Sequence, residues 1–476
     1  MIYYVGHWQA KRSDLLPDDI LLEIFDFCVG GQWEDGKGIV ERWQLLVHVC
    51  QRWRDLVFRS PRRLNLQLYC TPKTPAKDTL DVWPALPLIV RGSMDTSSTE
   101  TDNVIAALGQ NNRVSQVFLY GLADRQLEQV LVSMQVPFPK LTRLWLTSDR
   151  KTLPVVNVIP DSLLDGSAPR LRGLDLYGIP FPGLPKLLLS ATHLVHFVLS
   201  DVPHSGYISP ESMVALLSVL SSLEFLSLGF QSPQSRPDQV SRRPPPSKRS
   251  VLPALIVFRF KGVIEYLEDL VTPMDAPQLD GMDILFFNQI NVDTPRLVQF
   301  IHRTPKLKNR DALAHVLFID GYASVSLPPR SNRALKIGIS CEEPDWQLSS
   351  IEQVCNSLHP LSTVEDLCIG DRYQQLVWKS DAIDSALWLQ LLLPFTAVKH
   401  LYLSKELSPV IATALKELVE GRIMEVLPSL QNIFVDRLES SGPFQENIGQ
   451  FVAARQLSDH PIAISVWDKD SDVKPM

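Results

Sequence analysis

A short apolar string recurs along most of this chain and constrains its fold more than any other feature. Each copy has an apolar residue, two others, an apolar residue, one other and an apolar residue, as at 141–146 (LTRLWL). Clear copies begin at 141, 171, 194, 223, 255, 279, 364, 398 and 430, and weaker ones at 114, 313 and 334. Their final residues lie 21 to 34 positions apart, on average about 29. Self-similarity of this kind predicts a repeat protein.

The interior of each repeat indicates a strand followed by a helix. The last three residues of each string alternate apolar, variable, apolar, which is typical of a short strand with one buried side. Helix-like stretches follow several strings, as at 211–223, 295–307 and 411–430. A doubly wound sheet would also alternate strands and helices, but twelve strands in one such domain would be unusual, and no glycine-rich phosphate turn follows any string.

This pattern resembles the leucine-rich repeat. The resemblance implies an irregular α/β solenoid of about 12 strand-helix repeats over residues 113–440. In such a solenoid the variable strand positions line one surface, which makes five of them candidate target-binding residues: Trp145, Asp175, Arg259, Tyr402 and Phe434. Aromatic residues and arginine are frequent at interface hot spots, although ordinary exposed strand residues explain each position equally well.

The N-terminal region predicts two amphipathic helices. Pro17 suits the first turn of a helix, and Asp18 and Asp19 interact favourably with its dipole. Apolar residues then recur along one face up to Cys28. Four glycines interrupt the pattern between residues 30 and 38, after which residues 41–58 predict a second amphipathic helix that Pro61 closes.

The residues of these two segments resemble the F-box. LPDDILLEIF (16–25) followed by VCQRWRDLV (49–57) is similar to the F-box signature, in which a leucine-proline start precedes one helix and a VCxxWxxL string marks another. The resemblance covers about 45 residues, and the insert at 30–38 lengthens the first connection. RRLNLQL (62–68) and the segment 83–92 also resemble strings that follow F-boxes in large fungal families of F-box proteins.

The F-box resemblance implies a partner and no chemistry of the chain's own. F-boxes bind a Skp-type adaptor, which bridges to a cullin within an SCF-type ubiquitin ligase, and the rest of the chain then captures a protein substrate. Matching positions give eight adaptor contacts, some of which must face their own core: Leu16, Pro17, Ile20, Leu21, Ile24, Val49, Trp53 and Leu56. A few apolar anchors dominate the binding energy in docking of this kind.

The expected organisation is an N-terminal tail (1–14), an F-box (15–60), linker strands that cap the solenoid (61–112), the solenoid (113–440) and a C-terminal cap and tail (441–476). Residues 463–467 predict a last strand, and the final eight or so residues are expected to fray. Residues 231–252 predict an exposed loop, with five prolines and few apolar residues. Its basic residues Arg242, Arg243, Lys248 and Arg249 could form a nuclear-import signal, but a plain surface insertion is favoured.

Bulk composition narrows the function classes. A net charge of −7 disfavours general binding of nucleic acid. Six scattered cysteines without a CxxC pair favour a reducing compartment. No apolar stretch is long enough to span a bilayer, and no secretory signal is evident, so a cytoplasmic or nuclear protein without membrane contact is expected.

Sequence motifs for catalysis are absent. No GxSxG, HExxH or GxxxxGK[ST] string occurs, and His193 and His196 lack a third ligand nearby, so neither a metal nor another cofactor is expected. Two hypotheses remain: a ligase adaptor whose solenoid captures a target, and a non-catalytic leucine-rich-repeat scaffold whose N-terminal helices only cap the solenoid. An enzyme, such as a hydrolase, is a distant third that would require a convergent polar pocket.

Overall fold

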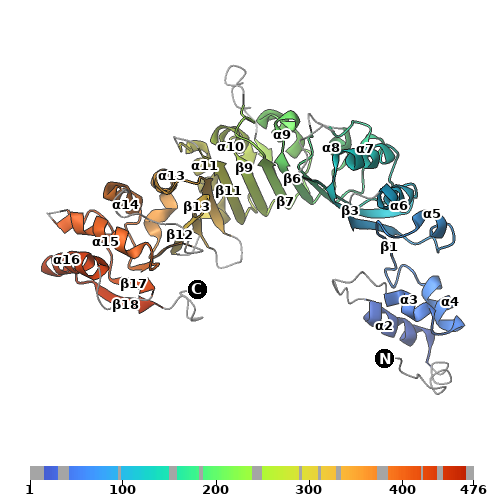
Figure 1. Ribbon diagram of the computed structural model, residues 1–476, viewed down its shortest axis with the longest axis horizontal. Helices are drawn as coiled ribbons and strands as arrows, with labels where there is room; N and C mark the ends of the chain where they lie inside the picture. The colour runs from blue at the N-terminus through green and yellow to red at the C-terminus, as the bar shows by residue number, and fades with distance from the viewer. Residues whose placement is uncertain are drawn as a thin grey trace. The chain divides into compact units, whose positions relative to one another are not determined.

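The structure, a computed structural model, forms a mixed α/β fold in two compact units (Figure 1). Unit 1 comprises Met1–Ile179 and Pro185–Leu194, and unit 2 comprises Pro180–Leu184 and Val195–Met476. The described residues are 16–29, 42–94, 98–149, 158–181, 186–237, 249–288, 292–308, 312–328, 334–371, 384–419, 422–436 and 443–467. The tail at 1–14, the insert at 30–38, Arg242, Arg243, Lys248 and the last eight residues lie outside them.

The described part of unit 1 begins with three short helices: α2 (Asp18–Val29), α3 (Arg42–Val47) and α4 (Gln51–Arg59). Their interior is apolar, with Phe25 and Val57 completely buried. The prediction of one continuous helix over 41–58 is wrong. The backbone at Cys50 is extended (φ −159°, ψ 169°), which ends α3 and lets α4 start in a new direction.

A parallel sheet follows in unit 1. Its strands lie in chain order: β1 (Leu68–Cys70), β2 (Leu88–Ser93), β3 (Val114–Leu122), β4 (Arg143–Ser148) and β5 (Gly173–Tyr177). The connections carry α5 (Ala76–Thr79), α6 (Ser98–Leu108), α7 (Asp124–Ser133), the 3-10 turn η1 (Leu163–Gly166) and, after β5, α8 (Lys186–Ser190). Parallel neighbours need such crossovers, because a tight hairpin can join only antiparallel strands.

The alternation of each string decides which side chains of unit 1 are buried. Leu144 and Leu146 of β4 are fully buried, and Trp145 between them lies on the opposite face of the sheet. The register places Leu146 beside Leu119 of β3 and Leu176 of β5, so apolar rows run across the strands. We call the face that carries Trp145 the open face.

The main sheet of unit 2 is mostly parallel. Its spatial order is β6 (His196–Val202), β7 (Phe225–Phe230), β9 (Val257–Gly262), β11 (Gly281–Phe287), β14 (Leu335–Ser340), β13 (Tyr322–Leu327), β12 (Leu313–Ile319), β15 (Asp366–Asp371), β16 (His400–Leu403), β17 (Asn432–Asp436) and β18 (Ala463–Trp467). A separate pair joins β8 (Ser250–Val251) to β10 (Met274–Asp275).

Helices of unit 2 lie along one side of this sheet, as α9, α10 and α11 do beside strands β6 to β11 in Figure 1. The helical segments are η2 (His204–Gly206), α9 (Pro210–Leu217), α10 (Ile264–Val271), α11 (Pro295–Arg303), α12 (Pro305–Lys308), α13 (Pro344–Ser357), η3 (His359–Thr363), α14 (Ser385–Leu392), α15 (Ser408–Lys416), η4 (Glu417–Val419) and α16 (Pro443–Leu457). The three stretches expected to be helical at 211–223, 295–307 and 411–430 each overlap at least one of these helices.

All twelve recurrent strings overlap strands, which confirms the strand prediction. The strand-then-helix prediction is wrong between β12 and β14. Between β12 and β14 the described residues form β13, which pairs antiparallel with both neighbours. The strings at 313–318 and 334–339, which overlap β12 and β14, have the shortest spacing between final residues, 21 positions. This spacing leaves little room for a crossover helix. Asp320 and Gly321 form the turn between β12 and β13, with Gly321 at φ +71°, where glycine is favoured.

A buried arginine holds the last helix of unit 2 to the segment before β17. Arg455 of α16 is 0% exposed, and its guanidinium donates to the carbonyls of Ile423 (3.3 Å), Leu427 (3.2 Å), Pro428 (3.2 Å) and Leu430 (3.3 Å). Burial lowers the pKa of Arg455, and the carbonyls accept hydrogen bonds from both of its Nη groups. One side chain therefore organises a connection that has no regular hydrogen-bond ladder.

Replacing Arg455 with methionine is expected to loosen this region. The change leaves buried carbonyls without donors, at a cost of at least about 2 kcal/mol, since hydrogen bonds to a charged group contribute roughly 1.5–3 kcal/mol each. Hydrogen-deuterium exchange should become faster in residues 422–436 and 443–457. Arg422→Met is the matched control, because Arg422 is exposed and forms a surface ion pair with Glu425 (2.7 Å). Equal exchange in the two variants would contradict the assigned role of Arg455.

Candidate interaction surfaces

The N-terminal helices of unit 1 expose a set of large apolar side chains. We call this set the docking surface; its members are between 38% and 89% exposed: Leu16, Ile20, Ile24, Phe27, Leu45 and Val49. Ile20, Ile24 and Phe27 follow one another at steps of four and three, which places them along one side of α2, and Leu16 lies just before the helix. Leu45 and Val49 are also four apart. Apolar side chains grouped in this way are typical of a surface that binds another protein.

A polar clamp fixes the start of the docking surface. The guanidinium of Arg52, on α4, donates to the carbonyl of Leu16 (2.6 Å) and to the carboxylate of Asp18 (2.7 Å). Asp18 also lies in the first turn of α2, where a negative charge is favourable. The segment before α2, which carries Leu16, is thereby held against α4, which carries Arg52, although the two residues are 36 positions apart.

The eight predicted adaptor contacts divide into two groups. Leu16, Pro17, Ile20, Ile24 and Val49 are exposed. Leu21, Leu56 and Trp53 instead pack within the helical region: Leu21 is 1% exposed, Leu56 is 9% exposed, and the Trp53 ring lies 4.7 Å from the ring of Phe25. Sequence reasoning missed Phe27 and Leu45. Phe27 continues the spacing of Ile20 and Ile24, so the helical period itself was the available signal.

The position of Trp53 predicts a structural role. Trp53→Ala should destabilise residues 18–29 and 42–59 by about 3 kcal/mol, because it removes a large ring from beside Phe25. Hydrogen-deuterium exchange of these segments measures the effect, and Trp53→Phe, which keeps an aromatic ring, should largely preserve protection. Unchanged exchange in Trp53→Ala would show that the ring is a surface anchor and not a core residue.

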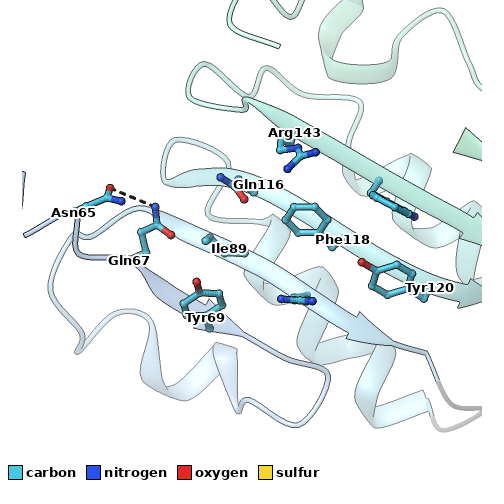
Figure 2. A pocket seen from close by; sticks show the side chains of 10 residues that line it. Asn65, Gln67, Tyr69, Ile89, Gln116, Phe118, Tyr120 and Arg143 are labelled. Atoms are coloured by element: carbon cyan, nitrogen blue, oxygen red, sulfur yellow. Dashed lines mark hydrogen bonds between the residues drawn. The ribbon is translucent and has the colours of Figure 1, made fainter. Parts of the chain in front are cut away.

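The open face of unit 1 contains a hollow of about 430 Å³, which we call the open-face hollow (Figure 2). It extends over strands β1 to β4 and the residues that precede β1. Its lining residues are Asn65, Gln67, Tyr69, Ile89, Arg91, Gln116, Phe118, Tyr120, Arg143 and Trp145. The strand residues among them all occupy the variable positions of their strands.

Two arginines of the hollow flank one aromatic ring. The guanidinium carbons of Arg91, on β2, and Arg143, on β4, lie 5.9 Å and 5.8 Å from the ring centre of Phe118, on the strand between them. None of the ten lining residues is acidic. Beyond them, Trp145 stacks on Tyr177 with 5.5 Å between ring centres. The hollow therefore combines positive charge with flat apolar surfaces.

The five predicted target-binding residues do not form one site and lie on different strands of the two units. In unit 1, Trp145 lines the hollow, while its register neighbour Asp175 is buried (1% exposed). In unit 2, exposed Arg259 lies 5.3 Å from the ring centre of Phe225. Tyr402 and Phe434 face each other in register with ring centres 4.6 Å apart, and Tyr402 is only 8% exposed. Five strands lie between β9, which carries Arg259, and β16, which carries Tyr402.

The described residues around Tyr402 include no activated nucleophile. Cys368 faces Tyr402 in register, and burial raises the pKa of its thiol to about 12. Burial also raises the pKa of Asp366, against a smaller opposing effect of His400. A thiol with this pKa is protonated near neutral pH, whereas catalytic cysteines need a thiolate.

The described residues contain no group of three or more His, Cys, Asp or Glu side chains that could hold a metal ion. His193 is exposed just before β6, and His196 stacks on Phe225 with 4.4 Å between ring centres. No helix within the described segments has the length and apolar character needed to cross a bilayer.

Comparison with known proteins gave no match: no family model fits this chain, and no curated protein is significantly similar to it.

Proposed function

We propose that this protein is the substrate-recognition subunit of an SCF-type ubiquitin ligase. In this proposal the docking surface binds a Skp-type adaptor and through it a cullin, and the strand-helix repeats form a leucine-rich-repeat-like solenoid that binds a protein target. The chain is then a non-catalytic adaptor of the cytoplasm or nucleus.

The docking surface is the observation that carries this proposal. The exposed residues Leu16, Pro17, Ile20, Ile24 and Val49 belong to the two strings that resemble the F-box signature. Leaving such side chains in water is unfavourable, since full burial of one isoleucine is worth roughly 1.5–3 kcal/mol. A partner that presents an apolar groove would remove them from water, as in other helix-in-groove complexes.

The competing scaffold hypothesis assigns these helices only a capping role. A cap needs the buried side of α2, which includes Leu21 and Phe25, but it has no use for the exposed side. The apolar character of Ile20 and Ile24 is therefore unexplained by the scaffold hypothesis and expected for an adaptor-binding protein.

Charge placed on the docking surface should abolish adaptor binding. The double variant Ile20→Asp, Ile24→Asp is expected to weaken binding to a purified Skp-type adaptor by about 100-fold or more, because two buried isoleucines are lost and two charges become desolvated. Isothermal titration calorimetry measures the affinity. Leu16→Ala with Pro17→Ala should give a smaller loss at the same surface.

Val132→Asp provides the matched control, because Val132 is an exposed apolar residue (60%) on α7 of the same unit. It should bind the adaptor as the wild type does. Wild-type protein that does not bind the adaptor would refute the ligase proposal and leave the scaffold hypothesis.

A further inference from the structure

We propose that the outer edge of β18 pairs with the same edge of a second copy of this chain, so that the protein forms a reversible dimer through a continuous sheet. The pairing is antiparallel and two-fold symmetric, with Ser465 of one copy opposite Ser465 of the other. This inference goes beyond the proposed function and does not depend on it.

The backbone of β18 leaves one side open for pairing. β18 lies beside β17 at the end of the sheet in unit 2 (Figure 1), and the N–H of Ala463 donates to the carbonyl of Gln431 (2.9 Å). The backbone groups of a strand alternate in direction, so the N–H and carbonyl groups of Ile464 and Val466 point away from β17. Within the described segments no strand pairs with that side. A row of backbone groups of this kind is a template for a further strand.

The apolar rows of the core also extend beyond the covered part of the sheet. Ile464 and Val466 lie in register with Ile433 and Val435 of β17, which are 0% and 2% exposed. Their own exposed fractions are 36% and 62%. The same rows are therefore well covered at one strand and poorly covered at the next. A strand added to the open edge extends both rows and removes apolar surface from water.

The edge lacks the features that usually prevent such pairing. β18 (AISVW) contains no charged residue and no proline, whereas natural edge strands are often very short or carry lysine or proline. β1, the first strand of the sheet in unit 1, has only three residues, and its Leu68 and Cys70 are 0% and 2% exposed. Of these two strands, β18 is the longer one and the one that exposes apolar side chains.

The residues of β18 are complementary to themselves, which makes a second copy the fitting partner. In an antiparallel pair centred on Ser465, Ile464 of one copy lies opposite Val466 of the other. Both have outward backbone groups, so they exchange both N–H···O bonds, and the two-fold axis repeats the exchange. A shift by one residue would place outward groups opposite inward ones and lose these bonds.

The side chains fit the same register. Ile464 and Val466 of the two copies meet on the face that packs against helices, so the apolar rows become continuous across the axis. On the opposite face, small Ala463 lies opposite large Trp467. Because the contact uses the same surface on both copies, it closes at two chains and does not propagate into a fibre.

The size of the contact sets its expected strength. A pair of five-residue strands with two apolar rows is smaller than the roughly 1,200 Å² that stable complexes bury. We therefore expect a dissociation constant in the micromolar range and a dimer fraction that rises with concentration.

Sedimentation velocity of the purified full-length protein at roughly 1 to 100 µM measures this association. The wild type should shift from monomer towards dimer across the range. Val466→Pro should raise the dissociation constant by about tenfold or more, because it removes an outward N–H. The monomer should tolerate this proline, since an edge strand does not use that N–H for its own sheet.

Val466→Lys should weaken association to a similar degree, because it places a charge in the apolar row at the axis. Val251→Lys is the matched control. Val251 is also an exposed strand valine of unit 2 (54%), and it lies on β8 in the separate two-stranded pair. This control should associate as the wild type does, and thermal melting followed by circular dichroism checks that each variant folds.

A cysteine at the symmetry axis tests the register. Ser465→Cys places two thiols in a non-hydrogen-bonded pair with Cα atoms about 4.5 Å apart, a separation that a disulfide spans. Mild oxidation should therefore cross-link this variant into a covalent dimer on a non-reducing gel. Ala463→Cys should not cross-link, because its equivalents lie roughly 13 Å apart along the strands. The wild type, with its six cysteines, gives the background.

Three results would overturn the inference. The first is a wild type that stays monomeric at every concentration, which would assign the edge to residues 468–476 or to a strand of another protein. The second is association that neither Val466→Pro nor Val466→Lys weakens although both variants fold. The third is cross-linking of Ala463→Cys as efficient as that of Ser465→Cys.

Discussion

The fold depends on apolar rows that run across neighbouring strands. A strand with one apolar side cannot bury that side alone, and each further strand and helix covers the one before. The end of the sheet in unit 2 shows the effect: Val435 of β17 is 2% exposed, whereas its register partner Val466 of β18 is 62% exposed. The two side chains have the same size and lie in the same row, so the difference in exposure comes from the neighbours that cover them.

Two arginines, half-buried Arg113 and buried Arg455, supply hydrogen-bond donors that the apolar rows lack. The connections between strands vary in length and lack a regular ladder, so their carbonyls need other donors. Arg113 in unit 1 donates to the carbonyls of Leu80, Pro84 and Leu86, and Arg455 plays the corresponding part in unit 2. In both cases the arginine follows its acceptors by about one repeat. A planar group with five donors can satisfy several differently spaced carbonyls, which allows the repeats to differ in length.

The strands were predictable because each recurrent string alternates apolar and variable residues. The helices were predictable because parallel neighbouring strands require crossover connections. β13 was not predicted, because the recurrent string indicates a crossover helix after β12. Asp320-Gly321 between alternating apolar residues is nevertheless a known hairpin signal. The break between α3 and α4 was also missed, because the apolar period continues across Cys50 while the backbone turns. Periodicity reports which side chains are buried, and it does not report the direction of the chain.

The candidate surfaces were predictable to a different degree. Motif positions located the docking surface, but they could not separate Ile20, which is exposed, from Leu21, which is buried, because the packing of α2 against α3 and α4 decides between them. The open-face hollow was beyond sequence reasoning, which selected Trp145 but not Arg91 or Arg143. These arginines lie 52 positions apart in sequence, and the pairing of β2 and β4 with β3 brings both beside Phe118.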